Sequence, residues 1–210
     1  MRTGWEYYTT NMTEMSIHAP NRPIRLAALL AAALLMLAGL SACGEDPEDS
    51  AGIDYETALA GAPAPLAAVH DQGNEVLGGG VEAYRDRLEE LRGYPVIVNK
   101  WASWCGPCRF EFPAFQRLSA RFGKRVAFLG VDSNDSTDAA ATFLEQYPVP
   151  YPSYSDPDEE IAKELTSFQG FPTTAFYDRN GELLYTKLGP YTSDDEFIAD
   201  IRRYSLGGES

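Results

Sequence analysis

The sequence predicts an α/β fold in which a central β-sheet becomes antiparallel at its last strands. Strand and helix patterns alternate along the chain from about residue 62. Residues 96–101 are apolar and β-branched without sustained alternation, which is typical of a parallel strand covered on both faces. Near the end of the chain, two strand patterns flank the hairpin turn signal Asp178-Arg179-Asn180-Gly181. We therefore expect residues 62–210 to form one α/β domain.

In the first half of this domain, apolar strand candidates alternate with apolar residues at helical spacing. The helix after the central strand carries Cys105 and Cys108 at its start. Pro113 is expected to kink this helix, and Gly123 is expected to end it. The expected elements in order are strand 66–69, helix 81–92, strand 96–101, helix 105–122 and strand 126–132.

In the second half, helix starts are marked by their capping residues. Ser136 is expected to cap one helix, which Pro148 ends. Asp156-Pro157-Asp158-Glu159 combines an N-cap, a proline at the first helical position and an acid at the third. Ser193 precedes three acidic residues that suit the first turn of the last helix. The expected elements in order are helix 136–147, extended segment 151–155, helix 156–168, strands 173–177 and 182–187, and helix 193–201.

The amino terminus has the pattern of an export signal. Two arginines precede the apolar run 26–40, which is too short for a comfortable transmembrane helix but suits a signal-peptide core. Residues 1–11 do not look like a positively charged leader, so the sequence is compatible with a translation start at Met12 or Met15.

The end of the apolar run, Leu40-Ser41-Ala42-Cys43, resembles the lipobox of bacterial lipoproteins. This resemblance implies that residues 1–42 are a signal peptide, that Cys43 is lipidated, and that the protein is anchored on the outer side of the cell membrane. The alternative is an uncleaved signal anchor with a free Cys43. Both interpretations place the domain outside the cytoplasm.

Residues 43–61 are predicted to form a flexible acidic tether behind the lipid anchor, because the segment is acidic and rich in proline. The whole chain carries a formal net charge of −14. Such an excess of negative charge repels nucleic acid, and we therefore expect no nucleic-acid partner.

The tetrapeptide Cys105-Gly106-Pro107-Cys108 places a dithiol where a strand leads into a helix. Backbone N–H groups at a helix N-terminus stabilise a thiolate, which is the form that carries out disulfide exchange. Cys105 lies at the open end and can attack a partner disulfide. Cys108, one turn further on, can then displace the mixed disulfide.

Two other interpretations of this cysteine pair are weaker. A tetrahedral zinc site needs two more cysteine or histidine ligands, and the rest of the chain offers only Cys43, His18 and His70. A structural disulfide across two intervening residues gains little loop-closure entropy. We therefore expect a redox-active disulfide, with no metal and no other cofactor.

Several motifs together resemble the thioredoxin fold. They are Trp101-Ala102-Ser103-Trp104 before the dithiol, Gly170-Phe171-Pro172-Thr173, and the hairpin that ends near Gly189. The segment Cys108-Arg109-Phe110-Glu111-Phe112-Pro113 and an inserted β-α block at about 137–168 resemble the membrane-anchored, extracytoplasmic thiol-disulfide oxidoreductases of the TlpA/ResA kind, which are associated with cytochrome c maturation. The resemblance implies a mixed sheet flanked by helices, with an N-terminal extension.

The resemblance also implies roles for individual residues. Glu111 would tune the cysteine pKa values and shuttle the proton of the resolving thiol; a solvated helix carboxylate is the alternative. The Phe171–Pro172 peptide bond would be cis, and the backbone before it would pair with the substrate polypeptide. The residues implied to contact substrate are Trp104, Gly106, Pro107, Phe171, Pro172 and Thr173.

The sequence departs from ordinary thioredoxins at two buried positions. Those proteins have a buried aspartate on the central strand and a lysine on the next strand, whereas alignment places Asn99 and Phe128 there. Because the aspartate and the lysine are both absent, neither is left as an unpaired buried charge. Glu111 then becomes the candidate for proton transfer. Lys100 replaces a usually apolar residue, and we expect it to pair with an acidic residue on a neighbouring element. Trp101 is expected in the core.

The leading hypothesis is a monomeric enzyme that reduces disulfides in exported proteins. The resemblance implies a membrane thiol-disulfide electron donor, and apocytochrome c as one client. A thiol peroxidase would need a threonine or serine three residues before the reactive cysteine and a proline seven before it, where Ala102 and Val98 stand. A copper or zinc chaperone would use Cys-x-x-x-Cys with a distant histidine, and this spacing does not match.

Overall fold

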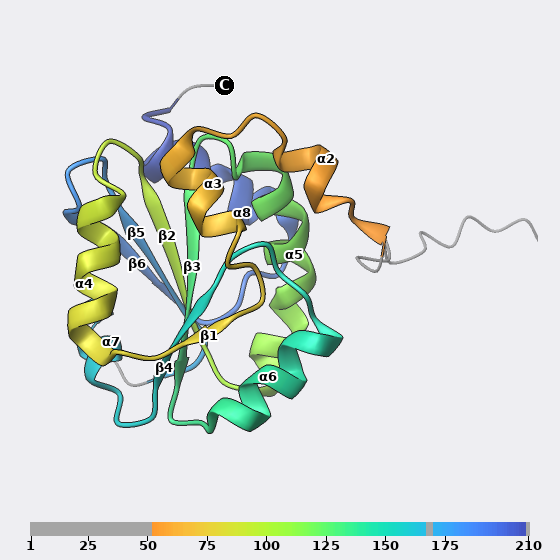
Figure 1. The fold of residues 1–210 in the computed structure, drawn as a ribbon, viewed down its shortest axis with the longest axis vertical. Coiled ribbons are helices and arrows are strands. Elements are labelled where there is room, and N and C mark those ends of the chain that lie inside the picture. Colours follow the sequence, from red (N-terminus) through yellow and green to blue (C-terminus); the bar gives the residue numbers. More distant parts are fainter. Residues whose placement is uncertain (1–51, 167–169, 209–210) are drawn as a thin grey trace, which may run out of the picture. The chain divides into compact units, whose positions relative to one another are not determined.

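A six-stranded mixed sheet organises the domain, with strand order β1-β4-β3-β2-β5-β6 (Figure 1). This computed structural model describes residues 52–166 and 170–208. The first four strands in that order run parallel, and β5 and β6 run antiparallel to their neighbours, which confirms the predicted sheet. The strands are β1 (Val76–Leu77), β2 (Val96–Trp101), β3 (Ala127–Ser133), β4 (Ser153–Asp156), β5 (Thr173–Tyr177) and β6 (Leu183–Leu188).

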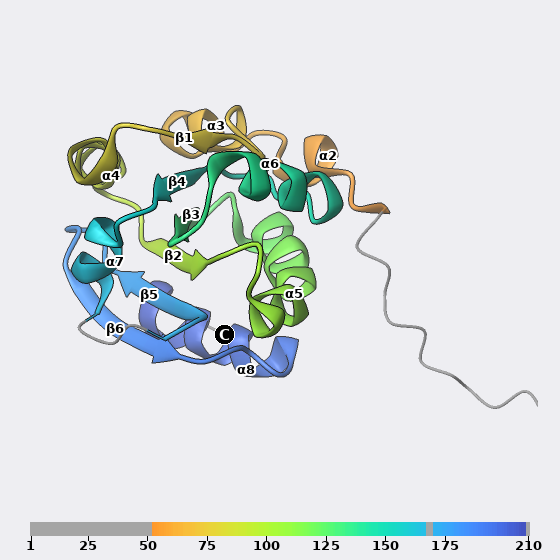
Figure 2. The same cartoon turned by 90° about the horizontal axis from the view of Figure 1, so that it is seen from below.

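Helices cover both faces of this sheet (Figures 1 and 2). Helices α4 and α7 contact each other on one face, while α5 and α8 contact each other on the other. The helices are α2 (Tyr55–Leu59), α3 (Ala64–His70), α4 (Gly80–Glu90), α5 (Gly106–Phe122), α6 (Thr137–Gln146), α7 (Glu160–Leu165) and α8 (Asp194–Asp200), and a π-helical turn (Ile201–Ser205) follows α8. Within the described ranges, no helix has the length and apolar character needed to cross a membrane.

The predicted caps at Ser136 and Ser193 and the predicted hairpin are confirmed. The Ser136 hydroxyl accepts a hydrogen bond from the Ala139 N–H at 3.3 Å and begins α6, and the Ser193 hydroxyl does the same for α8. In the β5–β6 turn, the Asp178 carboxylate accepts two backbone N–H bonds, and Gly181 has a φ of +77°. Local side-chain chemistry therefore determined these boundaries.

The segment before β2 corrects two expectations and contains one strand that was not predicted. Residues 66–69 were expected to form a strand, but they lie in α3, because a proline in its first turn favours a helix and because Leu66 and Val69 bury the same face. The two-residue strand β1 was not predicted. Part of the expected tether is also folded, since Asp54 caps α2 and Leu59 is buried. The signal peptide and Cys43 lie outside the described residues.

The helix expected from residue 156 begins four residues later, as α7. Asp156 is the last residue of β4, and its buried carboxylate accepts hydrogen bonds from the N–H groups of Ile161 and Ala162, both at 2.9 Å, and from the Ser133 hydroxyl at 2.8 Å. Glu159 adopts a left-handed φ of +57° to turn the chain into α7. Asp156 therefore caps the helix from the end of a strand. Phe168, expected on the buried face of this helix, lies outside the described residues.

Replacing Asp156 tests this junction. We expect Asp156→Ala to lower the free energy of unfolding by about 2–4 kcal/mol, because it leaves buried N–H groups at the start of α7 without an acceptor. Urea unfolding measures the loss. Asp158→Ala is the matched control, since that side chain is exposed, and equal losses in both variants would contradict the capping role of Asp156.

Candidate active site

Cys105 and Cys108 form a disulfide at the N-terminus of α5, with their Cα atoms 5.3 Å apart. Cys105 is the N-cap residue of the helix, and its Sγ accepts a hydrogen bond from the Cys108 N–H at 3.1 Å. Cys105 retains 3% exposure, whereas Cys108 is completely buried. A sulfur from another molecule therefore reaches Cys105 before Cys108, and the helix N-terminus stabilises negative charge on the Cys105 sulfur.

Glu111, one turn after Cys108 on α5, is buried and not a solvated helix carboxylate. One carboxylate oxygen accepts a hydrogen bond from Asn99 Nδ2 at 2.7 Å, and the other accepts from the Tyr191 N–H at 3.2 Å. Burial raises the pKa of Glu111 to about 8, although these two hydrogen bonds and the charge of Lys187 act in the opposite direction. The site thus holds an acid that can exchange a proton near neutral pH.

Asn99 and Tyr191 reach Glu111 from different segments of the chain. Asn99 lies in the centre of β2, at the position where alignment with thioredoxins placed it, and its amide donates directly to the carboxyl of Glu111. Tyr191 lies after β6; its ring stacks on Phe197 at 4.1 Å, and its hydroxyl donates to Asp200. Sequence analysis missed Tyr191, because its contribution is a backbone N–H and 80 residues separate it from Glu111.

The loop before β5 contains a cis peptide bond between Phe171 and Pro172, as the resemblance implied. The Pro172 carbonyl accepts a hydrogen bond from the Gly189 N–H at 3.0 Å. Thr173 corrects an expectation: its side chain is fully buried and donates to the Gly170 carbonyl at 3.1 Å, so it does not face substrate. The reason is that Thr173 begins β5, which lies between β2 and β6.

An aromatic rim, defined here as Trp104 and Phe171, flanks the disulfide. The indole of Trp104 is 56% exposed and contacts the Phe171 ring edge-on, with centroids 5.0 Å apart. Gly106 and Pro107 are also exposed. Phe110, on the first turns of α5, is 65% exposed and was not identified from the sequence. Trp101, by contrast, is buried against Phe112 and Phe143, as expected.

The β3–α6 loop fixes the chain that leads into Cys105. The Asp135 carboxylate accepts the Ser103 N–H at 2.5 Å, and the Asn134 carbonyl accepts the Trp104 indole N–H at 2.9 Å. Below this loop, Asp132 at the end of β3 is fully buried. Burial, followed by the charge of Asp135, a hydrogen bond with Asp135 and the charge of Asp156, raises the pKa of Asp132 to about 8. Neither Asp132 nor Asp135 was singled out from the sequence.

Lys100 has the acidic partner that was expected. Its ammonium lies 3.4 Å from a carboxylate oxygen of Glu159, the residue before α7. The described residues contain no group of three or more histidine, cysteine, aspartate or glutamate side chains arranged to hold a metal ion.

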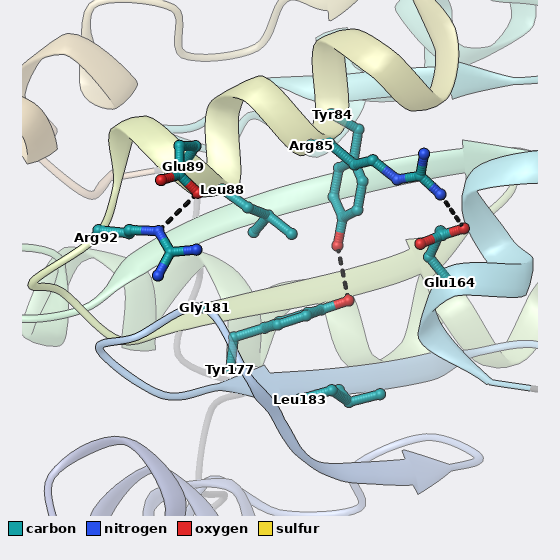
Figure 3. Close-up of a pocket in the computed structure, with 9 residues that line it drawn as sticks. All are labelled: Tyr84, Arg85, Leu88, Glu89, Arg92, Glu164, Tyr177, Gly181 and Leu183. Carbon is teal, nitrogen blue, oxygen red and sulfur yellow. Dashed lines mark hydrogen bonds and ion pairs between the residues drawn. The ribbon is translucent and has the colours of Figure 1, made fainter.

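A separate cleft of about 370 Å³ lies between α4, α7 and the β5–β6 hairpin (Figure 3). The hydroxyls of Tyr84 and Tyr177 meet across it at 3.1 Å, and Arg85 pairs with Glu164 at its rim. None of the predicted site residues lines this cleft, so the redox site and the cleft are distinct.

Comparisons with known proteins agree with the geometry of the site. The model of the AhpC/TSA family matches residues 63–186. The chain is 33% identical to the thiol-disulfide oxidoreductase ResA of Oceanobacillus iheyensis over 118 residues, which are 55% of this chain and 61% of that protein. It is 33% identical to the thiol:disulfide interchange protein DsbE of Escherichia coli K12 over 187 residues, which are 87% of this chain and 93% of that protein.

A solved structure is also similar. The structure of MTB DsbF in its mixed oxidized and reduced forms matches with a TM-score of 0.50 and 29% identity, over 56% of this chain and 85% of that one. The similarity to DsbE extends over almost the whole relative, whereas the similarity to ResA covers less than two thirds of it.

The burial of Glu111 predicts a pH-dependent stability. Its pKa is about 8 in the folded domain against an ordinary value of 4.5, so the folded state holds this proton more tightly than the unfolded chain. Stability therefore falls as the pH rises between these two values, by up to about 1.4 kcal/mol per pH unit for one group. We expect Glu111→Gln to remove this contribution, as measured by urea unfolding of the oxidised protein.

Glu145→Gln on the exposed face of α6 is the control for this experiment. It should keep the slope of the wild-type protein, and Asp132 should leave a residual slope in the Glu111 variant. Identical pH dependence in wild-type protein and Glu111→Gln would show that Glu111 does not hold a proton in this range.

Proposed function

Because the chain belongs to the AhpC/TSA family and is a thiol-disulfide oxidoreductase of the DsbE/ResA type, we propose that it reduces disulfides of exported proteins through Cys105 and Cys108. One observation carries the proposal: in the disulfide at the start of α5, Cys105 retains a slight exposure of 3% and Cys108 has none, with a buried acid one turn beyond. This arrangement supports a nucleophile, a resolving thiol and a proton-exchanging acid on a single helix.

The first step is an attack by the Cys105 thiolate on one sulfur of a client disulfide. A bond forms between Cys105 and that sulfur, the client disulfide breaks, and the second client sulfur leaves as a thiolate. The Cys108 N–H, which is 3.1 Å from the Cys105 Sγ, stabilises the thiolate before the attack. The aromatic rim, in which Trp104 is exposed and Phe171 is half-buried, offers apolar surface to the client polypeptide beside this sulfur.

The second step is an attack by Cys108 on the Sγ of Cys105. The ring disulfide forms, the mixed disulfide breaks, and the client leaves with two thiols after receiving two electrons. Cys108 must lose its proton before it attacks. In its ionised form Glu111 is suited to accept this proton, and its pKa of about 8 is close to that of an ordinary thiol, about 8.5, so that the proton can pass between the two groups.

The cellular setting is also part of the proposal. We assign residues 1–42 to a signal peptide and propose that Cys43 carries a lipid, with a tether within residues 43–61. The redox domain would then lie on the outer side of the cell membrane. Electrons would come from a membrane thiol-disulfide donor, and apocytochrome c is a candidate client. The redox domain would act as a monomer, with Trp104, Gly106, Pro107 and Phe171 as its substrate-contacting surface and with the buried residues Pro172 and Thr173 contributing their backbone.

Trapping the intermediate tests the exchange mechanism. We expect Cys108→Ser to accumulate mixed disulfides between Cys105 and exported proteins, because the resolving sulfur is missing. Non-reducing electrophoresis detects these adducts, and mass spectrometry identifies the clients. Cys105→Ser is the matched control and should form none. Equal adduct levels in the two variants would rule out Cys105 as the nucleophile.

The reduction potential tests the direction of electron flow. A Gly-Pro pair between the cysteines matches reducing thioredoxins, so we expect a potential near −270 mV in equilibrium with thiol buffers. A potential near that of a strong oxidant, about −120 mV, would reverse the direction and leave the exchange chemistry intact.

A further inference from the structure

The ammonium group of Lys100 is buried beside the active site. This residue lies in β2, directly after Asn99, and is 1% exposed. A buried charge is costly unless it is well paired. The distance of 3.4 Å to Glu159 is longer than the 2.7–2.9 Å or so of a strong charge-assisted hydrogen bond, and Glu159 is 21% exposed. The ion pair therefore provides only part of the stabilisation that the buried ammonium group needs.

The second partner of Lys100 is the ring of Phe171. The ammonium nitrogen lies 4.1 Å from the ring centroid, and this distance is within the range of a cation–π interaction. Because Lys100 is buried, water is excluded and the interaction is stronger than it would be at the surface. The same ring also contacts the exposed Trp104, with the ring centroids 5.0 Å apart. A continuous line of contacts thus runs from Glu159 through Lys100 and Phe171 to the surface beside the disulfide.

The side chains of neighbouring residues of β2 lie on opposite faces of the sheet. Asn99 donates to Glu111 on α5, whereas Lys100 pairs with Glu159 at the start of α7. This follows from the alternation of side chains along a strand. Lys100 also pairs in register with Thr173 on β5, which places its backbone next to the end of the Phe171–Pro172 loop. Lys100 is therefore separated from the proton-handling groups and linked to the surface expected to bind substrate.

We propose that Lys100 is a positioning residue that holds Phe171 against Trp104 and thereby sets the affinity for polypeptide disulfides. The inference rests on the proposed function, because it assigns the aromatic rim to client binding. A rim held from beneath loses less conformational freedom when a polypeptide docks on it. Small disulfides, which need only the Cys105 sulfur, gain nothing from this arrangement.

The test compares Lys100→Met with the wild-type protein in the reduction of two substrates. One is the polypeptide insulin and the other is the small molecule hydroxyethyl disulfide, with dithiothreitol as the electron source in both assays. We expect KM for insulin to rise about tenfold, with kcat for both substrates changing less than twofold. Lys100→Arg should restore most of the affinity, because guanidinium also binds aromatic faces. Lys163→Met, which removes an exposed ammonium on α7, is the matched control and should behave as wild type.

Two further results complete the design. Lys100→Met should fold, since replacing a buried charge by an apolar side chain is often neutral or stabilising. In a double-mutant cycle, Phe171→Leu should raise KM for insulin, and adding Lys100→Met should raise it no further. If instead the two increases multiply, or if Lys100→Met leaves KM unchanged, the positioning role is wrong. If the wild-type protein itself does not reduce hydroxyethyl disulfide, the proposed function is wrong, whatever the role of Lys100.

Discussion

The buried carboxyl of Glu111 is the constraint on which the active site depends. Its two hydrogen bonds, from Asn99 on β2 and from the Tyr191 backbone after β6, connect the helix that carries the disulfide with the central strand and with the segment between β6 and α8. Neither donor is a cation, so the low polarity of the surroundings dominates and favours the protonated acid. The same contacts that position α5 therefore also provide a proton-exchanging group one turn from Cys108.

The two faces of the sheet and the loops at its strand ends hold different parts of the site. The face covered by α5 and α8 holds Glu111, Asn99 and Tyr191, whereas the opposite face holds the pair Lys100 and Glu159. Loops at the ends of β2 and β3 and before β5 supply the aromatic rim and the contacts that fix it. An α/β sheet suits this arrangement, because consecutive strand residues reach different layers while the strand itself stays rigid.

Local sequence signals predicted most of the fold, and long-range contacts explain what they missed. The range of β2 and the caps at Ser136 and Ser193 follow from residues adjacent in sequence, and they were predicted correctly. Residues 66–69 were misassigned, because a short apolar run suits a strand or a buried helix equally well. The dithiol and the cis proline were recognisable from motifs. The backbone donor at Tyr191, the buried side chain of Thr173 and the loop contacts of Asp135 depend on tertiary packing that no local pattern encodes.

The two raised carboxyl pKa values change how the acidity of this chain should be understood. The formal charge of −14 treats Glu111 and Asp132 as ionised, yet both have pKa values of about 8 and are largely protonated at neutral pH. The interior near the disulfide is therefore less anionic than the composition suggests. Because thiol-disulfide exchange places a negative charge on the attacking sulfur of the enzyme, this local neutrality spares the Cys105 thiolate the repulsion of further negative charges close to it.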